Sequence, residues 1–260
     1  MTNGVDLRRP EPHIAELVLD RPEAMNAIST AMAMGIGAAV REIEASPDVR
    51  AVVLTSMSEK AFCVGADLKE RNSFTDDELL AQRPVARAAY NGVLELTVPT
   101  VAAVHGYALG GGCELALSCD LIVADETAVL GLPEASVGVI PGGGGTQLLA
   151  RRVGWGRAAD LIFTARRVDA AEAYRLGIAD RVVAAGAARS GALELAAAIA
   201  SNSPVGVRNA KRAMRLGLDG SLASGLEIED GAWRATAFSG DRKEGVAAFN
   251  EKRKPNWPGE

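Results

Sequence analysis

Short runs of β-branched and other apolar residues recur along the first part of the chain, and longer segments with helical patterning separate them. The runs cover residues 14–19, 51–56, 100–105, 121–125 and 180–183, and the helical segments include residues 30–45, 77–96, 157–165 and 170–176. Strands that alternate with helices favour parallel pairing. The sequence therefore predicts an α/β fold.

The pattern changes after Gly186, where strand signals give way to alanine-rich helical segments. These segments are interrupted at residues 202–204, 218–220 and 239–241. At the first interruption Ser203 precedes Pro204, a pair typical of a helix start because serine caps the helix and proline fits its first turn. We predict an α/β core over residues 1–200 and a C-terminal helical region over residues 201–260, ending in an extended tail.

Composition narrows the function classes. The chain has 260 residues, of which 48% are hydrophobic and 23% charged, with a net charge of −5. This excludes a largely disordered chain and disfavours nucleic acid or an anionic membrane as a partner. The amino-terminal residues lack a signal-like apolar segment, no run is long enough to span a membrane, and the three cysteines form no CxxC pair. We therefore expect a reduced, cytoplasmic protein.

Glycine is concentrated in two segments. Residues 105–114, HGYALGGGCE, place three glycines between a strand and a helix, where free N–H groups could bind an anion or stabilise a developing one. A tight packing turn is an equally good interpretation of these residues alone. The second segment, residues 142–145, could also enter a helix, but it is not a Walker A loop because no Lys-Ser/Thr follows.

Two glutamates accompany these segments. Glu114 lies in an apolar context, CELALSCDLIV, and Glu134 precedes the second glycine cluster. Burial would raise the pKa of such a carboxyl group toward neutrality, which suits a general acid or base. Taken alone, each glutamate is better interpreted as a surface or helix-capping residue than as a catalytic one. Metal and triad chemistries have little support, because the two histidines lack partners at ligand spacing and no GxSxG motif occurs.

The glycine and glutamate segments resemble the enoyl-CoA hydratase/isomerase (crotonase) superfamily. The matching stretches are AFCVGADLKE (residues 61–70), HGYALGGGCELALSCDLIVAD (105–125) and GLPEASVGVIPGGGGTQLLARRVG (131–154), with weaker similarity over nearly the whole chain. The resemblance implies a spiral of ββα units with a C-terminal helical trimerisation region, assembled as a homotrimer or homohexamer. Some segments look particularly like the methylglutaconyl-CoA hydratase side of the family.

The resemblance also implies roles for individual residues. The backbone N–H groups of Ala66 and Gly111 match the oxyanion hole, which stabilises the enolate of an acyl-CoA thioester. Glu114 and Glu134 match the two acid/base residues of the hydratases, with Glu114 mainly activating water and Glu134 mainly delivering a proton. Coenzyme A would be part of the substrate, with no separate cofactor and no metal. Its contacts would involve, by the same resemblance, Ala66, Asp67, Leu68, Lys69 and Gly111, together with Phe249 and Lys252 of a neighbouring subunit.

The leading hypothesis is therefore an enoyl-CoA hydratase, which adds water across the 2,3 double bond of a 2-enoyl-CoA. The alternative within the superfamily is an isomerase or another lyase acting on a branched acyl-CoA. A non-catalytic scaffold that binds acyl-CoA or RNA is a third hypothesis, which the acidic net charge and the presence of both glutamates disfavour.

Overall fold

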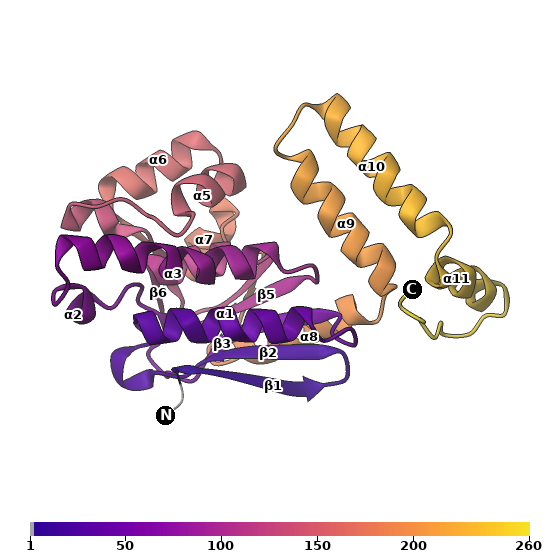
Figure 1. The fold of residues 1–260 in the computed structure, drawn as a ribbon, viewed down its shortest axis with the longest axis horizontal. Coiled ribbons are helices and arrows are strands. Elements are labelled where there is room, and N and C mark those ends of the chain that lie inside the picture. Colours follow the sequence, from indigo (N-terminus) through magenta and orange to yellow (C-terminus); the bar gives the residue numbers. More distant parts are fainter. Residues whose placement is uncertain (1–2) are drawn as a thin grey trace.

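The computed structural model describes residues 3–260, and its centre is a six-stranded sheet (Figure 1). The strand order is β1-β2-β3-β5-β7-β10, with β1 and β2 antiparallel and every other pair parallel. The strands are β1 (Val5–Glu11), β2 (Ile14–Leu19), β3 (Ala51–Ser56), β5 (Thr100–Val104), β7 (Leu121–Asp125) and β10 (Arg181–Val183). All five predicted strands are confirmed, with boundary differences of one residue in β5 and β10, whereas β1 was not predicted.

A second sheet of four short strands lies beside the first. It has the order β4-β6-β8-β9, made of β4 (Ala61–Cys63), β6 (Tyr107–Leu109), β8 (Val129–Gly131) and β9 (Arg167–Asp169). The pairs β3/β4, β5/β6 and β7/β8 are consecutive in the chain, so each turn of the chain adds one strand to each sheet. This produces the spiral of ββα units that the resemblance implied.

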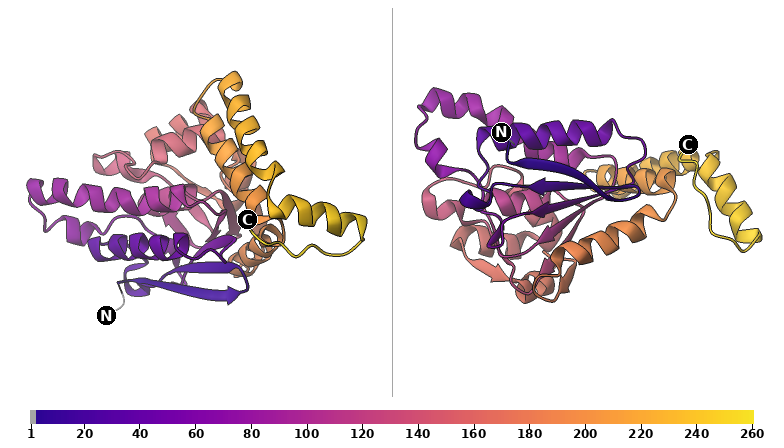
Figure 2. Two further views of the ribbon diagram at one scale, coloured as in Figure 1. Left: turned by 45° about the vertical axis from the view of Figure 1, so that its right-hand side comes forward. Right: turned by 90° about the horizontal axis from the view of Figure 1, so that it is seen from below.

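Helices cover both faces of the six-stranded sheet. On one face α1 (Thr30–Glu44) lies beside α3 (Asp76–Glu95), and on the other lies α8 (Ala188–Ala200) (Figures 1 and 2). Alternate residues of the strands serve the two faces: in β3, Val52 and Leu54 pack in the larger core and Val53 packs against the α8 side. The other core helices are α2 (Leu68–Arg71), α4 (Gly111–Leu117), α5 (Gly145–Val153), α6 (Trp155–Thr164) and α7 (Ala170–Leu176), with short 3-10 helices η1 (Pro22–Ala24) and η2 (Pro133–Val137).

Three further helices extend away from the sheets: α9 (Pro204–Gly217), α10 (Leu222–Ala237) and α11 (Gly240–Asn250) (Figures 1 and 2). They are separated at the predicted interruptions, and the Ser203 hydroxyl caps α9 by accepting a hydrogen bond from Gly206 N. Lys211 and Arg215 join α9 to the core through Asp120. Within residues 3–260, no helix has the length and apolar character needed to cross a membrane.

Candidate active site

The segment that follows β4 carries the first predicted oxyanion donor, Ala66. It pairs with Ile28, whose N–H donates to Gly65 O at 2.7 Å and whose carbonyl accepts from Asp67 N at 3.0 Å. Because this pairing uses the groups on either side of Ala66, it leaves the Ala66 N–H out of the bridge. The segment therefore fixes the position of Ala66 without consuming its donor.

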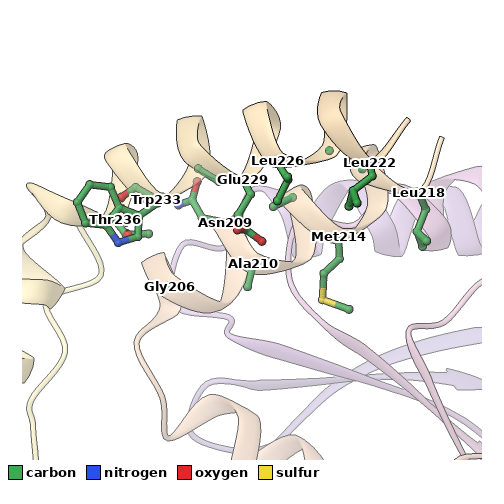
Figure 3. Close-up of a pocket in the computed structure, with 14 residues that line it drawn as sticks. Gly206, Asn209, Ala210, Met214, Leu218, Leu222, Leu226, Glu229, Trp233 and Thr236 are labelled. Atoms are coloured by element: carbon green, nitrogen blue, oxygen red, sulfur yellow. Dashed lines mark hydrogen bonds between the residues drawn. The ribbon is translucent and has the colours of Figure 1, made fainter. Parts of the chain in front are cut away.

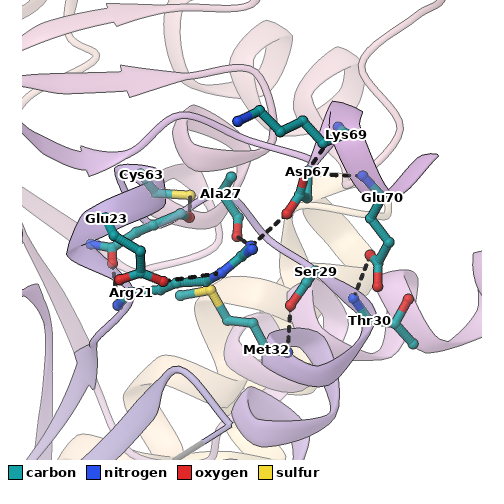
Figure 4. A network of polar contacts seen from close by, with 11 residues as sticks. Arg21, Glu23, Ala27, Ser29, Thr30, Met32, Cys63, Asp67, Lys69 and Glu70 are labelled. Carbon is teal, nitrogen blue, oxygen red and sulfur yellow. Dashed lines mark hydrogen bonds and ion pairs between the residues drawn. The ribbon is translucent and has the colours of Figure 1, made fainter. Parts of the chain in front are cut away.

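Asp67, the residue after Ala66, links this segment to Arg21 and to the start of α2 (Figure 4). Its Oδ1 accepts hydrogen bonds from Lys69 N at 3.0 Å and Glu70 N at 3.1 Å, which caps α2, and its Oδ2 pairs with Arg21 Nη1 at 2.6 Å. Arg21 also donates to Ala27 O at 2.9 Å. Burial alone would raise the pKa of Asp67, but the hydrogen bonds from Arg21 and the α2 backbone outweigh it and leave the pKa below its usual value.

The three glycines before Cys113 bring α4 into close contact with its neighbours. A Cβ on Gly112 would lie 2.0 Å from Cys63 O, and one on Gly65 would lie 2.8 Å from Gly111 N. Only glycine permits such an approach. The β4 segment and the start of α4 therefore meet, which brings Ala66 and Gly111 into adjoining segments. The tight packing turn that the sequence allowed for these glycines is present.

Glu114 lies on α4 and is 3% exposed. Its Oε1 accepts hydrogen bonds from Gly143 N at 2.6 Å and Gly145 N at 2.8 Å. The two glycine-rich segments, predicted as separate loops, are thus joined by this carboxylate. Burial raises the pKa of Glu114, although the hydrogen bonds from the glycine loop and the positive charge of Arg83 oppose that rise.

Glu134 approaches the same helix from η2. Its Oε1 lies 3.1 Å from the point that a Cβ on Gly110 would occupy. Its Oε2 is buried and has no hydrogen-bond partner within the described part of the chain. Burial, together with the negative charge of Glu114, raises the pKa of Glu134 to about 7. The structure thus places two carboxyl groups of raised pKa at the beginning of one short helix.

This arrangement suits proton transfer to and from a substrate that develops negative charge. Backbone N–H groups at the start of α4 can stabilise an anion, while two carboxyl groups with pKa values raised toward neutrality can exchange protons. Perturbed carboxyl groups of this kind are concentrated at functional sites.

Two residues of α3 belong to the site and were not identified from the sequence. The Tyr90 hydroxyl lies 2.3 Å from the point that a Cβ on Gly111 would occupy. Arg83 Nη2 donates to Gly142 O at 2.5 Å and so supports the loop that holds Glu114. The sequence carries no signal for either role, since Tyr90 lies on the apolar face of an amphipathic helix and Arg83 is an exposed helical charge.

The predicted coenzyme A contacts fall into two places. Leu68 and Lys69 are exposed on α2, two and three residues after Ala66. Phe249 and Lys252 lie at and just beyond the end of α11, and Phe249 is 83% exposed. Figures 1 and 2 show α11 well away from α2. A single chain therefore does not bring the two groups together, and the role of Phe249 and Lys252 toward a neighbouring subunit stays a prediction.

Comparisons with known proteins identify relatives of this chain. A family model described as enoyl-CoA hydratase/isomerase matches residues 10–260. The Bacillus subtilis protein YngF, whose name places it among the enoyl-CoA hydratases/isomerases, is 46% identical over 247 residues, covering 95% of each chain. The mouse mitochondrial enoyl-CoA hydratase domain-containing protein 2 is 40% identical over 257 residues, covering 97% of this chain and 87% of the mouse protein.

Solved structures show the same fold. The crystal structure of an enoyl-CoA hydratase from Bacillus anthracis superimposes with a TM-score of 0.97 at 40% sequence identity, covering 99% of this chain and 100% of that one. Both the family match and the relatives extend over nearly the whole chain. The chain therefore belongs to the enoyl-CoA hydratase/isomerase family.

Proposed function

We propose that this protein is a 2-enoyl-CoA hydratase, which adds water to a 2-enoyl-CoA and forms a 3-hydroxyacyl-CoA. The observation that carries the proposal is the pair Glu114 and Glu134, two carboxyl groups of raised pKa at the first turn of α4. A hydration needs one group to accept a proton from water and another to supply a proton to carbon. An isomerisation moves one proton between two carbons and can use a single carboxyl group.

In the proposed reaction the thioester oxygen accepts hydrogen bonds from the N–H groups of Ala66 and Gly111. Glu114, as the carboxylate, accepts a proton from water while the water oxygen bonds to C3 of the substrate. The C2–C3 π electrons move to form the enolate, whose negative charge rests on the oxygen held by the two N–H groups. Glu134, protonated near neutral pH, then delivers its proton to C2. A proton returns from Glu114 to Glu134, which restores both carboxyl groups for the next turnover.

The contacts of Asp67 refine its predicted role in coenzyme A binding. Both of its carboxylate oxygens already accept hydrogen bonds from protein groups. We therefore propose that Asp67 acts by holding the backbone at residues 66–69, while Lys69 supplies positive charge to the coenzyme A phosphates. Coenzyme A enters as part of the substrate, and the proposed mechanism uses neither a metal nor a separate cofactor.

We further propose that the C-terminal helices assemble the protein into a homotrimer or homohexamer. A groove of about 540 Å³ runs between α9 and α10. Figure 3 shows the apolar side chains along it, including Met214, Leu222, Leu226 and Trp233, all of which are exposed in the single chain. Exposed apolar surface of this kind marks protein–protein contacts. Light scattering tests this proposal, and a monomer at micromolar concentration would contradict it. A cytoplasmic location stays a prediction from the sequence.

The hydratase proposal is tested by the loss of conjugated enoyl-thioester absorbance when purified protein is mixed with crotonyl-CoA. We expect hydration by the wild type and its loss in both Glu114→Gln and Glu134→Gln. The incorporation of labelled oxygen from water separates hydration from isomerisation. If no oxygen is incorporated from crotonyl-CoA or from the branched 3-methylglutaconyl-CoA, while the double bond moves in a 3-enoyl-CoA, the protein is an isomerase and the proposal is wrong.

A further inference from the structure

Tyr90 is a buried polar residue that the mechanism above does not use. Its side chain is 5% exposed and packs in the larger core, on the face of α3 turned toward α4. Within residues 3–260 its hydroxyl forms no hydrogen bond, and the oxygen is not one of the fully enclosed unpaired atoms, so it keeps a small exposed area. Buried tyrosine hydroxyls normally have a hydrogen-bond partner, and a phenylalanine would fill a purely apolar position equally well. The unpaired hydroxyl therefore calls for a partner that is not part of the chain.

The Tyr90 hydroxyl lies close to Gly111, whose N–H group is one of the two proposed oxyanion donors. The oxygen lies 2.3 Å from the point where a Cβ on Gly111 would be, so it occupies the side-chain space of this glycine. In a right-handed helix the Cα–Cβ bond is tilted toward the N-terminus, which is also the direction in which the first N–H groups point. The Tyr90 hydroxyl therefore lies on the side of the backbone toward which the Gly111 N–H points.

The surroundings keep this hydroxyl protonated. The ring edge of Tyr90 and Glu114 Oε2 both lie 2.9 Å from the point that a Cβ on Gly143 would occupy, so ring and carboxylate are close neighbours. Burial, and after it the negative charge of Glu114, raises the pKa of Tyr90 above its usual value. A neutral phenol carries one O–H donor and can direct it at a developing negative charge.

We propose that the Tyr90 hydroxyl is a third donor to the thioester oxygen, beside the N–H groups of Gly111 and Ala66. This inference rests on the proposed acyl-CoA chemistry and adds a side-chain donor to a site otherwise built from backbone N–H groups. The hydroxyl strengthens its hydrogen bond as the oxygen changes from a carbonyl into an enolate, so it stabilises the transition state more than the bound substrate. No proton is transferred from Tyr90 in this role.

The test is Tyr90→Phe, which removes the hydroxyl and retains the ring. We expect kcat for crotonyl-CoA to fall by about 100- to 1,000-fold while KM changes by less than about threefold, as for loss of one oxyanion donor. We also expect a direct signature in the bound ligand. A conjugated dienoyl thioester of CoA should absorb at longer wavelength when its carbonyl is polarised on the wild-type enzyme, and this shift should be smaller on Tyr90→Phe.

Tyr174→Phe serves as the matched control, because Tyr174 is exposed on α7 and the substitution should leave kcat, KM and the absorbance shift unchanged. The proposal is overturned if Tyr90→Phe keeps kcat within about twofold of the wild type, or if it lowers kcat without reducing the absorbance shift. The second result would mean that the hydroxyl acts elsewhere than at the thioester oxygen. The absorbance measurement requires only binding, so it tests Tyr90 even if the protein proves to be an isomerase.

Discussion

The ion pair between Asp67 and Arg21 allows a quantitative test of how the oxyanion segment is held. Asp67→Asn keeps an efficient helix cap, because asparagine caps as well as aspartate, but it removes the charged partner of Arg21. The hydrogen bond between the charged groups, 2.6 Å long, contributes about 1.5–3 kcal/mol to stability. Asp67→Ala also removes the cap, which costs a further 1 kcal/mol or so. We therefore expect the free energy of unfolding to fall in the order wild type, Asp67→Asn, Asp67→Ala.

The pH dependence gives this prediction a definite sign. The pKa of Asp67 is lowered in the folded state, so the unfolded state binds the proton more readily. The stabilisation is then fully present above the usual aspartate pKa of about 3.9 and is lost as the pH falls through the lower, folded-state pKa. The difference in stability between wild type and Asp67→Asn should therefore be constant from pH 8 down to about pH 5 and should decrease below it.

Urea unfolding followed by circular dichroism measures these differences. Asp48→Asn is the control, because Asp48 is exposed and the substitution should change the unfolding midpoint very little. The reasoning is refuted if Asp67→Asn lies within about 0.5 kcal/mol of the wild type at pH 7, or if its deficit is unchanged at acid pH. If Asp67 positions Ala66 as proposed, Asp67→Ala should also lower kcat.

Three further predictions concern the other parts of the site and its support. Gly112→Ala should destabilise the fold by about 3 kcal/mol or more, because the new Cβ would lie 2.0 Å from a backbone carbonyl oxygen, whereas Gly156→Ala, with nothing within 4 Å, should leave the urea midpoint equal or higher. Hydration should decrease as the pH rises through about 7, because Glu134 then loses the proton it delivers; a kcat that is flat from pH 6 to 8 would contradict its role as the acid. Lys211→Met should cost about 1–3 kcal/mol in urea unfolding, since Asp120 then loses one of its two cationic partners and keeps Arg215 and the hydrogen bonds from Thr100. An unchanged midpoint would show that this ion pair does not stabilise the attachment of α9.

Most of the long elements of the fold could be predicted from the sequence, whereas the short strands of the second sheet could not. Strands β2, β3 and β7 have the predicted boundaries because apolar residues make up most of each strand and give a clear signal. The strands of the second sheet are three residues each, too short for any periodicity to show. Strand β1 was missed because its sequence, VDLRRPE, carries charges and a proline that an edge strand tolerates.

Some residues of the candidate site could also be identified from the sequence, and others could not. The glycine segments and both glutamates were visible in the sequence, and the resemblance supplied their roles. The hydrogen bonds from Gly143 and Gly145 to Glu114 join residues about thirty positions apart, which no local pattern can reveal. Tyr90 was missed because a tyrosine on the apolar face of a helix looks like any core residue. For Asp67 the resemblance implied a ligand contact, and the structure shows that its carboxylate is engaged within the protein.

The spiral order of the two sheets bears on when the site can form as the chain folds. Ala66 follows β4, Gly111 follows β6 and Glu134 follows β8, so three consecutive turns of the chain each supply one part. These turns are joined by parallel pairing, which requires long crossovers and brings together residues distant in sequence. Refolding chains should thus regain helical circular dichroism well before catalytic activity. The return of activity would report the moment at which the third turn docks on the second.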